Sequence, residues 1–398
     1  MRVLTFTSLF PNSVRRNLGV FVYQRMAAFA AREGNSVEVI APIPYSPAFL
    51  GGSKGQEFRK IPAREQIGNI TVHHPRYALL PGVSMPVHAW LMYAGSIGLA
   101  RKLHRENPFA CVDAHFVYPD GKAGLLVGQA LGVPTIVSAR GSDVNLFPQF
   151  ALIRPQIRKT LRRAAGRVAV CEALKTAMLE VAGEPCEVCV IGNGVDPERF
   201  FPVGRAEARA ELGLPQEGRL VVSVAALVPV KGQELLLRAF HQLQGKFPDL
   251  QLYLVGEGES RGQLEQLAAS MGIASRVHLP GSCSNERLRY WYGAADISCL
   301  ASSREGWPNV ILESLACGTP VVATRVWGTP EVLSSPELGI LVEQTEDSMA
   351  AGIEAALNRP CNQDLLVTYA RSRDWSVVAR EVEDYFKKVV EREAKKSQ

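Results

Sequence analysis

The chain has 398 residues, of which 47% are hydrophobic and 21% are charged. At about 100–200 residues per domain this length predicts two domains, and the composition excludes disordered and fibrous proteins. The net charge of +5 is uneven, because residues 1–195 carry 22 Lys and Arg against 12 Asp and Glu whereas the remainder carries 22 against 27. A basic first half favours an anionic partner, such as a phosphorylated acceptor, nucleic acid or a membrane surface.

The eight cysteines are too few for a disulfide scaffold and lie mostly among apolar residues. This pattern is typical of reduced thiols in a cytoplasmic protein. Cys186 and Cys189 form a lone Cys-x-x-Cys pair, and the chain has no Asp-x-Asp motif, so no metal site is predicted. Residues 77–100 carry no Asp, Glu, Lys or Arg, but prolines and glycine leave only twelve apolar residues from Ala89, too few to span a bilayer.

Short β-branched runs alternate with helical segments along the first half of the chain. The expected strands are 2–10, 36–42, 69–74, 110–114, 134–139, 167–171 and 187–191. The expected helices between them are 19–32, 85–105, 121–131, 152–165 and 172–181. This alternation predicts a parallel sheet covered by helices on both faces.

A stretch rich in Gly and Pro, residues 192–215, predicts a linker, after which the alternation resumes. The expected strands there are 219–225, 251–256, 276–279, 296–300, 320–323 and 339–342. The tail, 374–396, is predicted to be an amphipathic helix whose apolar face packs on the first domain. That face contains Trp375, Val378, Val382 and Phe386.

The block of residues 302–320 contains two glutamates, Glu305 and Glu313, and follows an expected strand. Pro308 suits the first position of a helix. The amides after Gly306 would then lie at a helix N-terminus, which binds anions such as a diphosphate. The carboxylates are eight residues apart, so one could contact a sugar ring and the other a ribose. The spacing leaves open a capped helix with two solvated glutamates.

Several other candidate residues lie where expected strands end, and ligands of open α/β sheets bind at that edge. Lys231 precedes a helix in the second half and could neutralise phosphate oxygens, or it could be an ordinary exposed lysine. In the first half His115 follows a strand, where a structural histidine is the alternative. Arg140 and Asp143 follow the next strand, and Arg16 lies in the first strand-to-helix loop.

Taken together, these motifs resemble those of the family 4 glycosyltransferases, a retaining family with the GT-B fold. The resemblance covers nearly the whole chain and is carried by the blocks 302–320, 228–232, 115–121 and 190–196, and by Trp375. It implies two Rossmann-like, doubly wound α/β domains that face each other across a cleft. The expected parts are an acceptor-side domain over 1–195, a nucleotide-sugar-binding domain over 196–373 and a helix over 374–398 that crosses back to the N-terminal domain.

The resemblance also implies roles for single residues. Glu305 would hold hydroxyl groups of the donor sugar, and His115 would reach the same sugar, so these two are the expected catalytic residues. Lys231 would neutralise the diphosphate, and Glu313 would bind the ribose. The other expected donor contacts are Gly19, Gly256, Gly281, Gly306, Trp307, Pro308, Asn309 and Val310. Arg16, Arg140 and Asp143 are expected on the acceptor side.

The sequence departs from the family pattern at two positions. The family usually has an arginine five residues before the lysine, and this chain has Ala226 there. Either Arg304, Arg261 or Arg16 replaces that cation, or the donor binds more weakly. Arg140 stands where many relatives have histidine, which leaves its role toward the acceptor open.

The implied function is retaining transfer of a sugar from a UDP- or GDP-sugar to a glycan or lipid-linked acceptor in polysaccharide or lipopolysaccharide biosynthesis. Neither a cofactor nor a metal is expected. The alternatives are a GT-B nucleotide-sugar epimerase and a degenerate nucleotide-sugar-binding protein. Nucleic acid is not an expected partner, because no aromatic interleaving or recognised motif accompanies the basic residues.

Residues 154–167 carry six Lys and Arg and no acidic residue. Arg154, Arg158 and Arg162 repeat every four residues, so on a helix they would form one stripe. The expected location is cytoplasmic, with this stripe resting on the anionic inner face of the cell membrane. A solvated basic helix face is the alternative.

Overall fold

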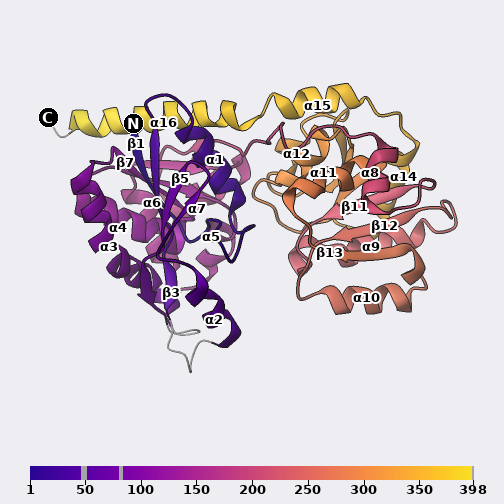
Figure 1. Cartoon of the computed structure of the whole chain (residues 1–398), viewed down its shortest axis with the longest axis horizontal. Coiled ribbons are helices and arrows are strands. Elements are labelled where there is room, and N and C mark those ends of the chain that lie inside the picture. Colours follow the sequence, from indigo (N-terminus) through magenta and orange to yellow (C-terminus); the bar gives the residue numbers. More distant parts are fainter. Residues whose placement is uncertain (46–51, 80–83, 397–398) are drawn as a thin grey trace. The chain divides into compact units, whose positions relative to one another are not determined.

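The computed structural model describes residues 1–45, 52–79 and 84–396. Contacts divide the chain into two compact units: unit 1 contains Met1–Asn193 and Trp375–Gln398, and unit 2 contains Gly194–Asp374. Each unit is built on a predominantly or entirely parallel sheet (Figure 1). The expected α/β class with two doubly wound domains is thereby confirmed.

The main sheet of unit 1 has the strand order β10-β9-β8-β7-β1-β2-β5-β4. All neighbouring strands pair in parallel except β4, which runs antiparallel to β5. The strands are β1 (Arg2–Phe6), β2 (Ser36–Ile40), β4 (Arg64–Ile67), β5 (Ile70–His73), β7 (Cys111–His115), β8 (Thr135–Ala139), β9 (Gly166–Ala169) and β10 (Cys189–Val190). Every residue of β7 and β8 is buried, as expected for central strands with both faces covered.

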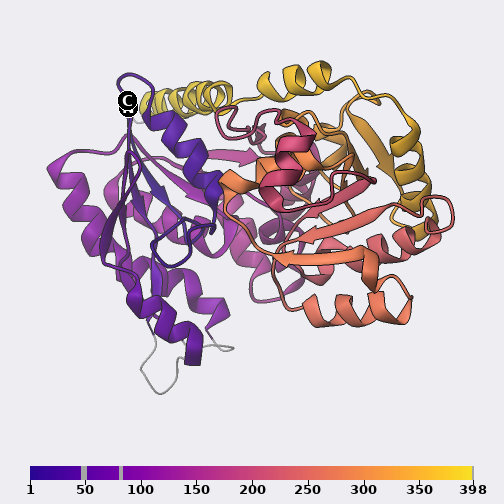
Figure 2. The same cartoon turned by 45° about the vertical axis from the view of Figure 1, so that its right-hand side comes forward.

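The helices of unit 1 lie on both faces of its sheet (Figures 1 and 2). They are α1 (Val20–Ala30), α3 (His88–Glu106), α4 (Lys122–Leu131), α5 (Ser142–Asn145), α6 (Arg154–Arg163), α7 (Glu172–Ala182) and α16 (Trp375–Lys396). Sequence analysis missed α2 (Gly52–Lys60), β4 and the small sheet of β3 (Ile43–Tyr45) and β6 (Arg76–Ala78). These short elements carry little hydrophobic periodicity of their own.

The first strand is shorter than predicted. It ends at Phe6 and not at residue 10. The amide of Ser8 donates a hydrogen bond to Asp120 Oδ1, which directs the chain out of the sheet into a loop. This loop ends at Gly19, the N-cap of α1, where the backbone φ is +61°. A Cβ atom at Gly19 would lie 2.2 Å from the Leu9 carbonyl oxygen, so only glycine fits there.

The tail helix α16 packs against α1 within unit 1. Trp375, Val378, Val382 and Phe386 are buried in one hydrophobic core with residues of α1, as predicted from their spacing. The rings of Phe29 and Phe386 lie 5.7 Å apart. The last helix in the sequence therefore completes the core of the first unit.

The sheet of unit 2 is entirely parallel, with the strand order β13-β12-β11-β14-β15-β16. Its strands are β11 (Leu220–Val224), β12 (Gln251–Val255), β13 (Val277–Gly281), β14 (Ile297–Leu300), β15 (Val321–Thr324) and β16 (Gly339–Val342). Alternate residues enter different cores: Leu220 and Val222 join one cluster, and Val221 joins the other.

Helices of unit 2 cover both faces of its sheet. One core packs against α9 (Gln233–Gln242), α10 (Arg261–Ser270) and α14 (Glu346–Asn358). The other packs against α8 (Arg205–Leu212), α11 (Asn285–Ala294), α12 (Asn309–Ala316) and α15 (Gln363–Arg371), and α13 (Thr329–Val332) follows β15. The predicted linker was wrong over 205–212, because these residues form α8, which packs on α11.

Part of the apolar stretch at 77–100 lies outside the described residues, namely 80–83. Its later part forms a 3₁₀ turn (Met85–Val87) and the first turns of α3. Ala89, Met92, Ser96 and Ala100 of α3 are buried. Across the described ranges, every helix is too short or too polar to span a bilayer.

Candidate active site

Glu305 and Lys231 come together in unit 2, although 74 residues separate them in the sequence. Lys231 Nζ lies 2.7 Å from Glu305 Oε1. Ser302 Oγ donates a second hydrogen bond to the same oxygen at 2.6 Å. The Glu305 side chain is 9% exposed and that of Lys231 is 27% exposed. Glu305 is therefore not a solvated glutamate. It forms a partly accessible ion pair with Lys231, and both residues are expected to bind the nucleotide-sugar donor.

The helix after Glu305 begins one residue later than predicted. Pro308 is its N-cap in an extended conformation, and α12 starts at Asn309. Pro308 also has no N–H group, so it cannot donate a hydrogen bond to a phosphate or a sugar. The expected anion site would therefore use the amides of residues 307, 309 and 310 at the positive end of the α12 dipole.

Glu313 lies in the second turn of α12 and faces α11. The hydroxyl group of Tyr292 donates a hydrogen bond to Glu313 Oε2 at 3.1 Å. Burial raises the pKa of Glu313 to about 7, since a carboxylate loses hydration when it is removed from water. The carboxyl group is therefore poised to change its charge near neutral pH.

The expected nucleotide glycines lie where two strands end. The amide of Gly256, after β12, donates to the carbonyl oxygen of Gly281 at 3.0 Å. A Cβ atom at Gly256 would lie 1.9 Å from the Ala225 carbonyl oxygen. Glycine at 256 therefore permits the close packing of β11 and β12 at the edge that carries Lys231.

His115 in unit 1 is fully buried, and unit 1 side chains contact both of its ring nitrogens. Nε2 lies 2.7 Å from Asp113 Oδ2, and Arg140 Nε donates to Nδ1 at 3.2 Å. Because a guanidinium group can only donate, the His115 proton belongs on Nε2. Burial lowers the pKa of His115 to about 4, so the ring is neutral at pH 7.

Asp143 accepts hydrogen bonds from backbone amides of two loops. The amides of Val117, Gly141 and Arg140 lie 2.7, 2.8 and 3.1 Å from its carboxylate oxygens. Asp143 therefore joins the loops that follow β7 and β8. Arg16 lies apart from this cluster, exposed in the loop before α1.

Two family patterns match the chain, one in each half. Residues 19–199 match the family described as "Glycosyltransferase Family 4", and residues 204–373 match "Glycosyl transferases group 1". A D-inositol 3-phosphate glycosyltransferase of Thermomonospora curvata is 30% identical to this chain, covering 72% of this chain and 73% of that protein. The chain belongs to the family 4 glycosyltransferases.

Two further proteins are similar to this glycosyltransferase, one in sequence and one in structure. TuaC of Bacillus subtilis, named for teichuronic acid biosynthesis, is 28% identical over 89% of this chain and 88% of its own length. The structure of HepE from Anabaena, in complex with UDP and glucose, is 18% identical. It superposes with a TM-score of 0.70 over 96% of this chain and 98% of HepE, which supports the GT-B fold.

Ala226 stands where the family resemblance implies an arginine. The residues that could supply this cation instead differ in whether a protein group already binds them. Ala226 is exposed, and its carbonyl oxygen accepts a hydrogen bond from Gln233 Nε2 at 2.9 Å. Arg261 is engaged, with Glu257 at 3.2 Å and Glu265 at 3.0 Å. Arg304 makes no ion pair or hydrogen bond with any described residue.

Three side chains that the sequence did not predict orient the expected site residues. Ser302 binds Glu305, Tyr292 binds Glu313, and Asp113 binds His115. Asp113 could have been found, because residues two apart on a strand lie on the same face. Tyr292 could not, because α11 meets α12 only through the tertiary fold. In the ranges that the structure describes, no three His, Cys, Asp or Glu residues are grouped to hold a metal ion.

Proposed function

We propose that this glycosyltransferase moves a sugar, with retention of anomeric configuration, from a UDP- or GDP-sugar to a glycan or lipid-linked acceptor. The ion pair of Lys231 with Glu305, in the loops before α9 and α12, carries the proposal. The UDP and glucose bound to HepE and the naming of TuaC support a nucleotide-sugar donor and a role in polysaccharide biosynthesis.

The ion pair would be exchanged when the donor binds. Lys231 turns from Glu305 to the diphosphate, whose negative charge is the stronger partner for an ammonium group. Glu305 Oε1, released from Lys231, accepts a hydrogen bond from a hydroxyl group of the donor sugar. Ser302 keeps the carboxylate oriented during this exchange, because it binds the same oxygen. Positioning and charge stabilisation of this kind are the main contributions expected from the protein.

Retention follows from front-face transfer. The bond between the anomeric carbon and the diphosphate oxygen breaks, and the acceptor oxygen bonds to the same face of that carbon. The acceptor proton passes to the leaving phosphate, so the scheme needs no protein base. His115 fits such a scheme as a neutral residue that orients Arg140, since its pKa of about 4 keeps it uncharged.

Arg304 supplies the second cation in this proposal. It directly precedes Glu305, and it is the candidate replacement in unit 2 without a protein partner among the described residues. Arg261 fits less well, because two glutamates already neutralise it.

We also propose that unit 1 contacts an anionic membrane surface through a membrane patch. Its apolar part is Val87, Trp90, Phe150 and Leu152, which are 48%, 49%, 47% and 69% exposed. Gln156 connects these segments, since its amide nitrogen donates to Pro86 O at 2.8 Å and to Leu152 O at 2.9 Å. The cations of the membrane patch are Lys122, Arg154, Lys159 and Arg163.

The patch differs from the stripe expected from the sequence. Arg158 Nε donates to Val181 O at 3.1 Å, and Arg162 Nε donates to Ala182 O at 2.8 Å. Both arginines therefore bind the last carbonyl groups of α7, and Arg162 also pairs with Glu184 at 3.3 Å, so these two members of the stripe are left out of the patch. Lys122 belongs to the patch instead, with its ammonium group 4.9 Å from the centre of the Trp90 ring.

Ligand-induced stabilisation and product analysis test the donor and the reaction. A bound UDP- or GDP-sugar raises the free energy of unfolding by mass action, by about 2.7 kcal/mol at a hundredfold excess over Kd, and the melting temperature rises with it. Transfer to a glycolipid acceptor should give a product whose NMR coupling at the new linkage matches the donor anomer. An inverted linkage would contradict retention. Release of an epimer without acceptor would favour the epimerase, and binding without turnover would favour the binding protein.

A further inference from the structure

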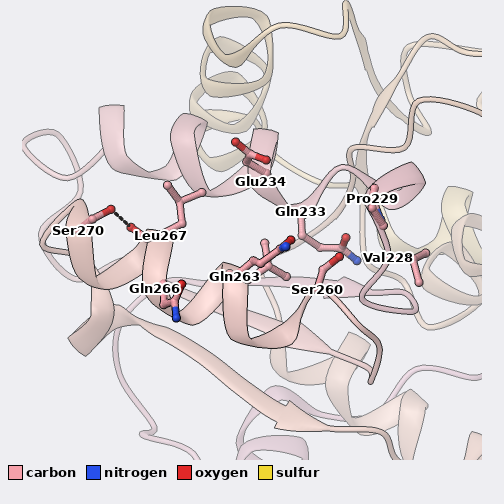
Figure 3. Close-up of a pocket in the computed structure, with 10 residues that line it drawn as sticks. Val228, Pro229, Gln233, Glu234, Ser260, Gln263, Gln266, Leu267 and Ser270 are labelled. Atoms are coloured by element: carbon pink, nitrogen blue, oxygen red, sulfur yellow. Dashed lines mark hydrogen bonds between the residues drawn. The ribbon is translucent and has the colours of Figure 1, made fainter.

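A cavity of about 500 Å³ lies in unit 2 between α9 and α10 (Figure 3). Its floor contains Gln233 and Ser260, and its rim contains Gln263 and Gln266. Neither Lys231 nor Glu305 lines it, so it is separate from the candidate donor site. Its volume falls within the range of small-ligand sites, about 300–1,000 Å³.

Ser260 is a buried residue whose hydroxyl group makes no hydrogen bond with the described residues. It occupies the N-cap position of α10, where serine normally accepts a hydrogen bond from a helix amide. Here the side chain makes no such bond, nor any other with the described residues. The residue is only 7% exposed, and it lines the cavity. A hydroxyl group in this position is available to a ligand.

Gln233 presents a second unused polar group. The residue is 3% exposed, and its amide nitrogen donates to Ala226 O at 2.9 Å. That bond fixes the orientation of the side chain. The amide oxygen Oε1 has no hydrogen bond with any described residue. Figure 3 shows the side chains of Gln233, Ser260 and Gln263 gathered in the same space. The floor therefore offers a fixed acceptor beside a hydroxyl group that can donate or accept.

The charge of the lining restricts the ligand. The described residues that line the cavity include no Lys or Arg, so a phosphate or carboxylate group would lack a counter-charge. The one acidic residue, Glu234, pairs with Arg238 at 2.8 Å. Leu264, Leu267 and Pro229 add apolar surface. The lining combines amide and hydroxyl groups with small apolar surfaces. It therefore matches a molecule that carries many hydroxyl groups and also has faces of C–H groups. It fits neither an ion nor a lipid chain.

We propose that this cavity binds a neutral saccharide, one or two sugar units of a glycan, at a site distinct from that of the transferred sugar. The proposal rests on the cavity and not on the proposed transfer reaction. Gln233 Oε1, Ser260 Oγ and the amides of Gln263 and Gln266 bind the sugar hydroxyl groups, and Leu264 and Leu267 contact its C–H face.

The site borders the loop that carries Lys231. Pro229, in the cavity wall, and Lys231 belong to the same 3₁₀ turn, Pro229–Lys231. The Ser260 amide also donates to Leu227 O in this loop at 3.0 Å. UDP-glucose binding, measured beside sugar binding, therefore reports whether a variant has disturbed the loop.

Saturation-transfer NMR on the full chain tests the proposal with D-glucose, D-galactose, maltose and maltotriose as probes. We expect at least one to bind saturably, with Kd on the order of 1–10 mM. D-Glucuronate and glucose 6-phosphate serve as anionic probes and should bind more weakly than glucose. We expect the affinity for the neutral sugar to fall about tenfold in Ser260→Ala, and also in the double variant Gln263→Leu with Gln266→Leu. Gln129→Leu, an exposed glutamine of α4, is the matched control.

Folding and donor binding are measured for the same variants. Because the Ser260 hydroxyl has no partner among the described residues, Ser260→Ala should keep the wild-type melting temperature and the wild-type shift with UDP-glucose. A fall in melting temperature without loss of sugar affinity would indicate a structural serine and overturn the proposal. So would saturable sugar binding that survives all the cavity variants, or an absence of sugar binding. Sugar binding by a protein that fails to bind any nucleotide sugar would sink the proposed donor reaction and leave this inference standing.

Discussion

At the scale of single residues, the proposed reaction depends on Lys231, because few other cations are placed to neutralise the diphosphate of the donor. Lys231 and Glu305 neutralise each other in the structure, and Ala226 stands where the family resemblance implies an arginine. A diphosphate that enters this site meets Lys231 and, in our proposal, Arg304. The charge stabilisation of the leaving group is therefore concentrated on two side chains.

We expect Lys231→Ala to lower kcat by about 100-fold or more, the scale of a lost transition-state electrostatic contact. Arg304→Ala should lower kcat less and raise KM for the donor. Lys246→Ala is a matched control, because Lys246 also forms an ion pair in unit 2, with Glu354 at 2.6 Å. Steady-state kinetics with donor varied at saturating acceptor check this. Activity of Lys231→Ala within threefold of wild type would reject the role.

Glu313 predicts a pH dependence of donor binding. Burial raises its pKa to about 7, so the carboxylate forms as pH rises through that value. If Glu313 binds the ribose as expected, this carboxylate accepts hydrogen bonds from the ribose hydroxyl groups. Donor affinity should therefore increase between about pH 6 and pH 8. A nucleotide sugar is a suitable probe, because its esterified diphosphate lacks the second ionisation near pH 6.

The matched variant separates Glu313 from other titrating groups. Glu313→Gln should weaken donor binding and remove most of the pH dependence, whereas Glu354→Gln, at a partly exposed glutamate of α14, should change neither. Calorimetric titration at several pH values gives both quantities. If donor affinity still rises with pH in Glu313→Gln, the pH dependence belongs to another titrating group.

At the scale of elements, α16 makes a testable contribution to unit 1. Its buried face packs against α1, and Glu383 forms ion pairs with Arg32 and Lys387 that lower the pKa of this carboxyl group to about 2. We expect truncation after residue 374 to expose this core and to lower the melting temperature or abolish folding. Removal of residues 395–398 alone is the control.

A point substitution keeps the test informative if the truncated chain fails to fold. Phe386 is 2% exposed and lies against Phe29. Phe386→Ala should cost about 3–5 kcal/mol, which corresponds to a fall of roughly 10 °C in melting temperature. A melting curve unchanged by both the truncation and Phe386→Ala would exclude this packing.

The membrane patch makes another prediction at the scale of elements. Each exposed cation near an anionic surface contributes about 1 kcal/mol, which salt screens, and Trp90 is an aromatic side chain suited to the interface. We expect more protein to co-sediment with phosphatidylglycerol vesicles than with phosphatidylcholine vesicles, and less at high salt.

Two variants define the patch. Trp90→Ala with Leu152→Ser should reduce vesicle binding at all salt concentrations, and Lys122→Gln with Lys159→Gln should reduce the difference between the two lipids. Arg101→Gln removes an exposed cation of α3 outside the patch and serves as control. Equal binding to both lipids by the wild-type protein would end the hypothesis.

At the scale of the whole molecule, the sequence determined the class of fold and the family. Buried apolar runs alternate with amphipathic segments, and this alternation is a local property of the chain. It located the central strands β7, β8 and β11 and the apolar face of α16. The motif around Glu305 identified the glycosyltransferase family because its residues are contiguous.

Contacts between distant segments were decided by the tertiary structure alone. The 2.7 Å pair of Lys231 and Glu305, the bond of Tyr292 to Glu313 and the bond of Arg140 to His115 each join segments that are distant in the sequence. Arg158 and Arg162 looked like free cations until their α7 partners were placed. A sequence records which charges a chain has, but hydrogen bonding and burial depend on packing. The charge state and the availability of each group therefore emerge only from the folded protein.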